Sequence, residues 1–84
     1  MPTPAKTVTV EYYAKLREEA GVSKEVINTF ARSAQDLFQE LKARHNITLP
    51  QNILKIAINN EFSPWTKELS NGDRIVIIPP VSGG

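Results

Sequence analysis

The residues of this chain whose chemistry stands out are its last two, Gly83 and Gly84. A chain that ends on two glycines presents its own α-carboxyl group, and glycine has no Cβ, so the pair fits a channel too narrow for a side chain. Pro79 and Pro80 favour an extended chain and donate no backbone N–H, which disfavours a return into a sheet. We therefore expect residues 79–84 to be a tail that inserts into another protein, in preference to a loosely ordered end.

No other residues assemble into a recognisable reactive site. His45 is the only histidine and the chain has no cysteine, so no metal site is expected, and His45 is predicted to lie at the surface or at a helix end. Glu18 and Glu19 are adjacent, would not face a common substrate on a helix, and are predicted to be a solvated pair. Nucleophile-elbow, Walker and dinucleotide-binding glycine patterns are absent. The sequence therefore indicates a carrier, a modifier or a binding module without a bound cofactor.

Length and composition predict one soluble globular domain. The 84 residues are too few for two cores, and 40% hydrophobic with 23% charged residues is an ordinary globular balance. The net charge is +1 without a basic stripe, so nucleic acid is not an expected partner. The longest apolar run, residues 75–78, is too short to span a membrane, and no apolar signal core opens the chain. We expect a cytoplasmic protein that does not bind membranes.

Periodicity predicts an α+β fold with one main helix. This helix begins at Ser33, with Asp36 completing a capping box, and ends at Asn46. Its apolar stripe comprises Ala34, Leu37, Phe38 and Leu41. Alternation and turn signals predict strands over residues 7–13, 24–30, 53–58, 61–62 and 74–78, with a short helix over 14–20 that Gly21 ends. This order is the β-grasp arrangement, a mixed four- or five-stranded sheet in which the first and last strands are expected to be parallel neighbours.

The last predicted strand is apolar on both faces, although a single helix covers only one face of a sheet. Ile75 and Ile77 point one way, whereas Val76 and Ile78 point the other. We expect one core between helix and sheet, formed by Leu37, Phe38, Leu41, Val10, Ile56 and Ile75 or Ile77. The second face of the strand would then be exposed.

An exposed apolar patch usually marks a contact site. We expect Tyr13, Phe62 and Ile78 to form such a patch on the side of the sheet away from the helix. The alternative is that the loops 14–22 and 61–70 fold over this face with Trp65 as a plug. Trp65 is expected to anchor the core or a loop, and not to stack on a ligand.

Three blocks of the sequence resemble the small subunit of molybdopterin synthase, the MoaD-type family. Residues 12–21, YYAKLREEAG, are similar to its aromatic-Ala-x-x-Arg-Glu-x-x-Gly signature, and residues 57–60, AINN, to its Ala-Val-Asn strand end. Residues 69–84, LSNGDRIVIIPPVSGG, are similar to its Leu-x-Asp-Gly-Asp-x-Val run ending in Pro-Pro-Val-Ser/Thr-Gly-Gly. The chain departs from the family at Ile78, where an aromatic residue is frequent. The resemblance implies a ubiquitin-like β-grasp domain over residues 1–78 and a tail over 79–84.

The resemblance implies a sulfur carrier. In that family an adenylating enzyme, related to ubiquitin-activating enzymes, uses ATP to convert the terminal carboxyl to an acyl-adenylate, and sulfur then replaces AMP to give a thiocarboxylate. The tail enters the large subunit of molybdopterin synthase and donates sulfur to the dithiolene of molybdopterin, made from cyclic pyranopterin monophosphate. The active site lies in the large subunit. By position, Gly84 carries the sulfur, Gly83 threads the channel, and the partner contacts are Tyr13, Phe62, Ile78, Pro80 and Val81.

Other functions stay open from the sequence. One is a sulfur carrier for another pathway such as thiamine synthesis, although such carriers are usually shorter and lack Pro-Pro-Val before the two glycines. Another is a ubiquitin-like modifier joined to lysine by an isopeptide bond, since adenylation is the first step there too. A third is an interaction module that never uses its tail.

Overall fold

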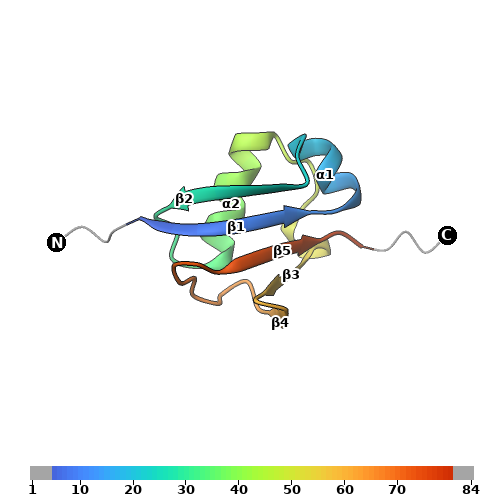
Figure 1. Cartoon of the computed structure of the whole chain (residues 1–84). Coiled ribbons are helices and arrows are strands. Elements are labelled where there is room, and N and C mark those ends of the chain that lie inside the picture. The colour runs from blue at the N-terminus through green and yellow to red at the C-terminus, as the bar shows by residue number, and fades with distance from the viewer. Residues whose placement is uncertain (1–4, 81–84) are drawn as a thin grey trace.

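The computed structural model describes residues 5–80, which form a five-stranded mixed sheet with one long helix packed across one face (Figure 1). The strand order is β2-β1-β5-β3-β4. β1 and β5 are parallel neighbours inside the sheet, and every other neighbouring pair is antiparallel. The elements are β1 (Lys6–Tyr12), α1 (Ala14–Ala20), β2 (Lys24–Thr29), α2 (Ala34–His45), the 3-10 helix η1 (Gln51–Ile53), β3 (Lys55–Ile58), β4 (Glu61–Ser63) and β5 (Arg74–Ile78). The predicted β-grasp fold is confirmed.

The third strand is shorter than predicted. It was expected to begin at Ile53, but Gln51–Ile53 is a 3-10 turn and β3 begins at Lys55. The Pro50 carbonyl accepts a hydrogen bond from the Ile53 N–H at 3.3 Å, which closes this turn. The Ile53 side chain is 42% exposed, so its apolar character does not continue the alternation of the strand. The first two strands also end one residue earlier than predicted, at Tyr12 and Thr29.

The predicted helix and core are confirmed. The Ser33 hydroxyl oxygen accepts from the Asp36 N–H at 3.2 Å, and Asp36 Oδ2 accepts from the Ser33 N–H at 3.3 Å, so the capping box is complete. Asn46 ends α2 in the left-handed conformation, with a φ of 54°. The core side chains that the sequence predicted are all buried in one cluster: Leu37, Phe38, Leu41, Val10, Ile56, Ile75 and Ile77.

Trp65 belongs to the helix side of the molecule. Its ring packs against Phe38 with the ring centroids 5.3 Å apart, and its carbonyl accepts from the Gln35 N–H at 2.9 Å. The prediction that Trp65 anchors a loop to the core is confirmed. Because the ring lies against α2, it does not plug the opposite face of the sheet, and that alternative is wrong.

His45 lies at the end of α2, as predicted, but its side chain is not at the surface. The ring is 14% exposed, and its Nε2 lies 2.6 Å from Glu25 Oε2, which also accepts from the Tyr12 hydroxyl at 2.5 Å. Arg44 Nη1 lies 3.8 Å from the other Glu25 oxygen. Burial raises the pKa of the Glu25 carboxyl, but the hydrogen bonds with Tyr12 and His45 and the charges of His45 and Arg44 outweigh it and bring the pKa below its ordinary 4.5. This cluster joins the end of α2 to β1 and β2.

Leu41→Ala should strongly destabilise the domain. Leu41 is fully buried between α2 and the sheet, and large-to-small changes at such positions cost about 2–5 kcal/mol. That is a large share of the stability of a small domain, about 5–15 kcal/mol. Urea unfolding measures the free energy, with Lys42→Ala, an exposed change one residue along the same helix, as control. A Leu41→Ala protein as stable as the control would contradict this core.

The Glu25 cluster should make stability depend on pH. Because the folded-state pKa of Glu25 is lowered, its contribution is present above the ordinary glutamate pKa and is lost as the pH falls through the folded-state pKa. Glu25→Gln should therefore lose stability near neutral pH and show a weaker acid dependence between about pH 5 and pH 3. Urea unfolding across this range, with the exposed Glu18→Gln as control, makes the comparison. Parallel pH profiles for Glu25→Gln and the unmodified protein would rule this contribution out.

Candidate functional site

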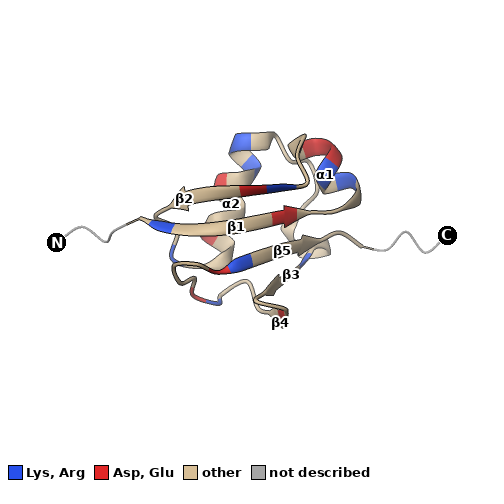
Figure 2. Ribbon diagram, in the orientation of Figure 1, with Lys and Arg blue, Asp and Glu red and all other residues tan. Residues whose placement is uncertain are grey.

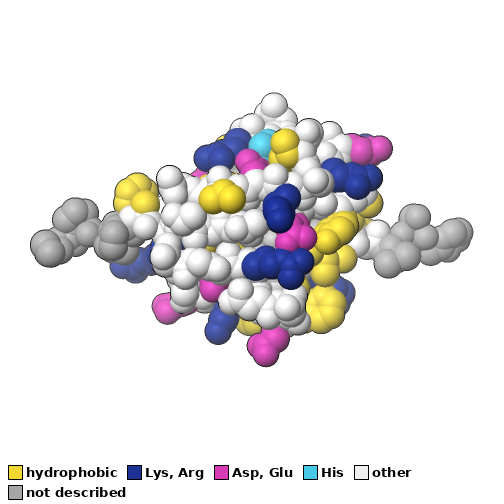
Figure 3. All heavy atoms as spheres, in the orientation of Figure 1, with side chains coloured by type: hydrophobic (Ala, Val, Ile, Leu, Met, Phe, Trp, Pro, Cys, Tyr) yellow, Lys and Arg dark blue, Asp and Glu magenta, His cyan; other side chains and the backbone are white. Residues whose placement is uncertain are grey.

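The face of the sheet away from α2 is open, and the predicted patch residues lie on it. In Figure 1, α2 lies behind the sheet and β1 and β5 run side by side towards the end from which the tail continues. Tyr13 is 47% exposed and Phe62 73% exposed, while Ile78 at the end of β5 is half-buried. Figure 3 shows hydrophobic side chains gathered at this end of the face. The loops therefore leave Tyr13 and Phe62 exposed and cover Ile78 only in part.

Strand register explains why Phe62 shares this face with β5. Phe62 is the cross-strand partner of Ala57, and Ala57 is the partner of Val76. Directly opposite residues point to the same side of a sheet, so all three side chains face away from α2. The prediction that Ile75 and Ile77 enter the core while Val76 and Ile78 face outward is confirmed, since the first two are fully buried and the last two are not.

A pocket of about 520 Å³ lies at the root of the tail. Its lining is mainly apolar and comprises Tyr13, Ala14, Lys15, Leu49, Ile78, Pro79 and Pro80. Three of the predicted partner contacts, Tyr13, Ile78 and Pro80, thus line one hollow, while Phe62 lies outside it. The remaining predicted site residues, Val81, Gly83 and Gly84, lie outside the described residues.

A sharp turn between β1 and α1 brings Tyr13 to the pocket. Tyr13 is extended, with φ −130° and ψ 153°, and Ala14 has a φ of 52° in the left-handed region. That region is unfavourable by about 1–2 kcal/mol for a residue with a Cβ. Leu16, fully buried, holds the following helix against the core, and its N–H donates to the Tyr13 carbonyl at 3.1 Å. Packing of α1 thus maintains a turn that local preference alone would disfavour.

Glu19 fixes the segment that carries Leu49, another residue of the pocket lining. One carboxylate oxygen accepts from the Thr48 N–H at 3.0 Å and the other accepts from the Thr48 hydroxyl. These bonds lower the pKa of the Glu19 carboxyl and tie α1 to the segment that carries Leu49. The prediction that Glu19 is merely solvated is therefore wrong. Its partner is 29 residues away, and no local pattern signals such a contact.

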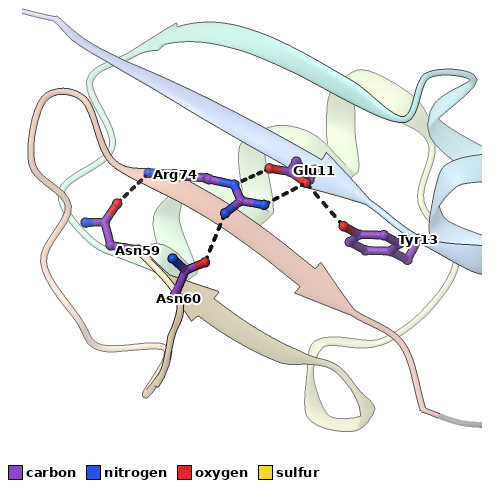
Figure 4. Close-up of polar contacts among 5 residues, drawn as sticks. All are labelled: Glu11, Tyr13, Asn59, Asn60 and Arg74. Atoms are coloured by element: carbon purple, nitrogen blue, oxygen red, sulfur yellow. Dashed lines mark hydrogen bonds and ion pairs between the residues drawn. The ribbon is translucent and has the colours of Figure 1, made fainter.

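A polar network crosses the open face between the central strands (Figure 4). Glu11 on β1 and Arg74 on β5 form an ion pair, and Figure 2 shows these oppositely charged residues on adjacent strands. Arg74 Nη1 also donates to Asn60 Oδ1 at 2.9 Å, and the Tyr13 hydroxyl donates to Glu11 Oε1 at 3.2 Å. The Arg74 guanidinium holds the pKa of Glu11 below its usual value. No sequence pattern indicates this network, because its two charged residues lie 63 positions apart.

A family model, that of the ThiS family, matches residues 10–84. The chain belongs to the ThiS family. It is also 36% identical over 83 residues to a molybdopterin synthase sulfur carrier subunit of Chlamydomonas reinhardtii, with 92% of this chain and 98% of that protein covered. The resemblance to molybdopterin synthase small subunits that the sequence motifs indicated is therefore confirmed.

Two solved structures are similar to this ThiS-family chain. A Pyrococcus furiosus protein described as molybdopterin converting factor, subunit 1, has a TM-score of 0.75 at 31% identity, covering 90% of this chain and 99% of its own. A chain from the complex of subunits 1 and 2 of the Helicobacter pylori molybdopterin-converting factor has a TM-score of 0.65 at 23% identity, covering 93% and 99%. The second likeness shows the shared fold.

The described part of this ThiS-family chain is suited to binding another protein at one end. Within residues 5–80, no helix is long and apolar enough to cross a membrane, and no three metal-ligating side chains gather together. An exposed apolar surface and an apolar pocket instead lie where the tail begins.

Proposed function

We propose that this chain is the sulfur carrier subunit of a molybdopterin synthase, and that its C-terminal carboxyl group carries the sulfur. The observation that carries the proposal is the position of the apolar pocket at the root of a tail whose sequence ends in Gly83-Gly84. Membership of the ThiS family and the sulfur carrier names of its relatives support it. The carrier itself would be non-catalytic, with the active site in the large subunit.

Activation of the tail needs a leaving group, because a carboxylate is a poor electrophile. An adenylating enzyme would transfer AMP from ATP to the Gly84 carboxylate and release pyrophosphate. A sulfide-level donor would then attack the acyl carbon and expel AMP, which leaves one sulfur in place of one oxygen. ATP is thus a substrate of that partner enzyme and would not be a cofactor bound by this chain.

Sulfur transfer requires the tail to reach into the large subunit. The six residues from Pro79 to Gly84 span about 20 Å when extended, enough to enter a site in a neighbouring protein. The thiocarboxylate sulfur would form a bond to a carbon of the pterin precursor, and an oxygen substituent would leave that carbon. Water would then hydrolyse the bond between the acyl carbon and the sulfur, which leaves the sulfur on the pterin and returns the tail as a carboxylate. A dithiolene contains two sulfur atoms and each tail carries one, so each product molecule requires two charged tails.

Docking would use the exposed end of the open face. Tyr13 and Ile78 line the pocket and Phe62 lies on the same face, so a partner could cover them while the tail enters its active site. The Helicobacter pylori relative is known from a complex with its subunit 2, which supports a protein partner of this kind. We propose that the large subunit of molybdopterin synthase is this partner and that the adenylating enzyme is a second one.

Deletion of Gly84 should abolish sulfur loading while the domain stays folded, because the tail lies beyond the last strand. The assay supplies the adenylating enzyme, ATP and a sulfur donor, and mass spectrometry of the C-terminal peptide detects exchange of one oxygen for sulfur. Gly83→Val should also fail, because it places a branched side chain in the passage. Thr3→Val, a change at the other end of the chain, is the control.

Three results would contradict the carrier mechanism. The first is a full-length protein whose terminus never gains sulfur, and the second is a protein without Gly84 that still supports molybdopterin synthesis. The third is a terminus recovered in isopeptide linkage to lysine and never as a thiocarboxylate, which would favour a modifier. A charged carrier that serves a thiamine precursor but not the pterin would favour the other sulfur pathway.

Phe62→Asp and Ile78→Asp should each weaken binding to the large subunit by about 2 kcal/mol or more, the effect typical of a central contact. Calorimetry measures the affinity, and circular dichroism checks the fold. Val26→Asp is a matched control, because Val26 is 67% exposed on the same face but lies on β2, the edge strand opposite the β4 strand that carries Phe62. Normal binding by both Asp variants, or equal losses in all three, would contradict the docking surface.

A further inference from the structure

The Arg74 side chain joins segments that are far apart in the sequence. Its guanidinium donates through Nε and Nη2 to the Glu11 carboxylate on β1 and through Nη1 to Asn60 in the β3–β4 turn (Figure 4). The Nη2–Oε1 distance is 3.2 Å and the Nη1–Oδ1 distance is 2.9 Å. The Glu11 side chain is only 13% exposed on a face that is otherwise open. The three nitrogens of the Arg74 guanidinium thus all donate hydrogen bonds to other residues of the same chain.

On one side, this network reaches Tyr13. The Tyr13 hydroxyl donates to Glu11 Oε1 at 3.2 Å, and the same oxygen accepts from Arg74 Nη2. Almost half of the Tyr13 side chain is exposed, so packing restrains it only in part. The direction of the ring along the face therefore depends on Glu11, whose carboxylate is held by Arg74.

On the other side, the network fixes the turn before Phe62. Asn59 and Asn60 have φ angles of 53° and 73°, in a region that residues with a Cβ rarely adopt. The Arg74 backbone binds Asn59, because its N–H donates to Asn59 Oδ1 at 3.0 Å and its carbonyl accepts from the Asn59 N–H at 2.8 Å. The Arg74 side chain binds the next residue of the turn through the Nη1–Asn60 Oδ1 bond of 2.9 Å. Phe62 is 73% exposed, so the backbone of this turn largely decides where its ring lies.

We propose that Arg74 is a positioning residue for docking, which holds Tyr13 and the turn that carries Phe62 in a fixed relation on the open face. The proposal rests on the proposed function, since the large subunit is the partner for which these side chains are held. Almost half of the Arg74 side chain is exposed, and ion pairs that are open to solvent contribute little to stability. Side chains that are ordered before binding lose less conformational entropy when the complex forms, so the gain is expected in affinity.

Arg74→Met should weaken binding to the large subunit by about three- to tenfold, with little change in melting temperature. Lys24→Met is the matched control, because Lys24 lies opposite Glu11 on β2 and its loss removes the same charge from the same face without breaking the network. This control should bind within about twofold of the unmodified protein. Equal losses in both variants would indicate a general charge effect and overturn the positioning role.

Two further measurements separate positioning from a general loss of structure. Tyr13→Phe keeps the ring but removes the hydroxyl, so its effect should overlap with that of Arg74→Met, and the double variant should lose less affinity than the product of the two single losses. In the free Arg74→Met protein, the amide signals of residues 60–62 should broaden, while those of α2 stay sharp. The proposal would be wrong if the affinity loss of the double variant equalled the product of the two single losses. It would also be wrong if the amide signals of residues 60–62 did not change in the Arg74→Met protein.

The proposed function and the positioning role can fail separately. If Phe62→Asp loses binding while Arg74→Met binds like the unmodified protein, the docking surface stands and the role of Arg74 is wrong. If the unmodified protein gains no sulfur and does not bind the large subunit, the proposed function is wrong and the role of Arg74 falls with it.

Discussion

The parallel pairing of β1 with β5 is the constraint on which the rest of the structure depends. It places Val10 beside Ile75 and Tyr12 beside Ile77, and all four side chains are buried in the core. Because the two strands run in the same direction, they end at the same edge of the sheet. The turn that exposes Tyr13 and the root of the tail therefore meet at one place, and the pocket forms between them.

The same strand serves the core and the surface. Along β5, alternate side chains enter the core or face outward, so the strand that leads into the tail also contributes Ile78 to the pocket. A bare apolar sheet face would favour unspecific association. Here the Glu11–Arg74 pair occupies the middle of the open face, and the apolar residues that we assign to docking gather at one end. The arrangement keeps the exposed apolar area small and next to the tail.

Sequence reasoning succeeded where the deciding interactions are local. The capping box, the apolar stripe of α2, the strand alternation and the turns each depend on residues a few positions apart, and the structure confirms them. The parallel pairing of the first and last strands is typical of the β-grasp arrangement, but the sequence pattern alone does not determine it. The start predicted for the third strand is wrong because Ile53, although apolar, is exposed and lies in a 3-10 turn before the strand.

Contacts between distant residues could not be predicted in this way. The Glu19–Thr48 anchor, the Glu25–His45 contact and the Glu11–Arg74 pair join residues 29, 20 and 63 positions apart. None has a periodic or motif signature, because each depends on where the completed fold brings two polar side chains. The reactive end of the chain is the opposite case. Its chemistry follows from the residues Gly83 and Gly84 themselves and from family membership.

The central claim is that the C-terminal carboxyl group carries sulfur in the cell. The most direct measurement is the intact mass of the protein isolated from its own cells after deletion of the large subunit, so that the charged form is not consumed. The account predicts a species in which one oxygen has been replaced by sulfur at Gly84. A protein found only as the free carboxylate, or only in isopeptide linkage to other proteins, would contradict it.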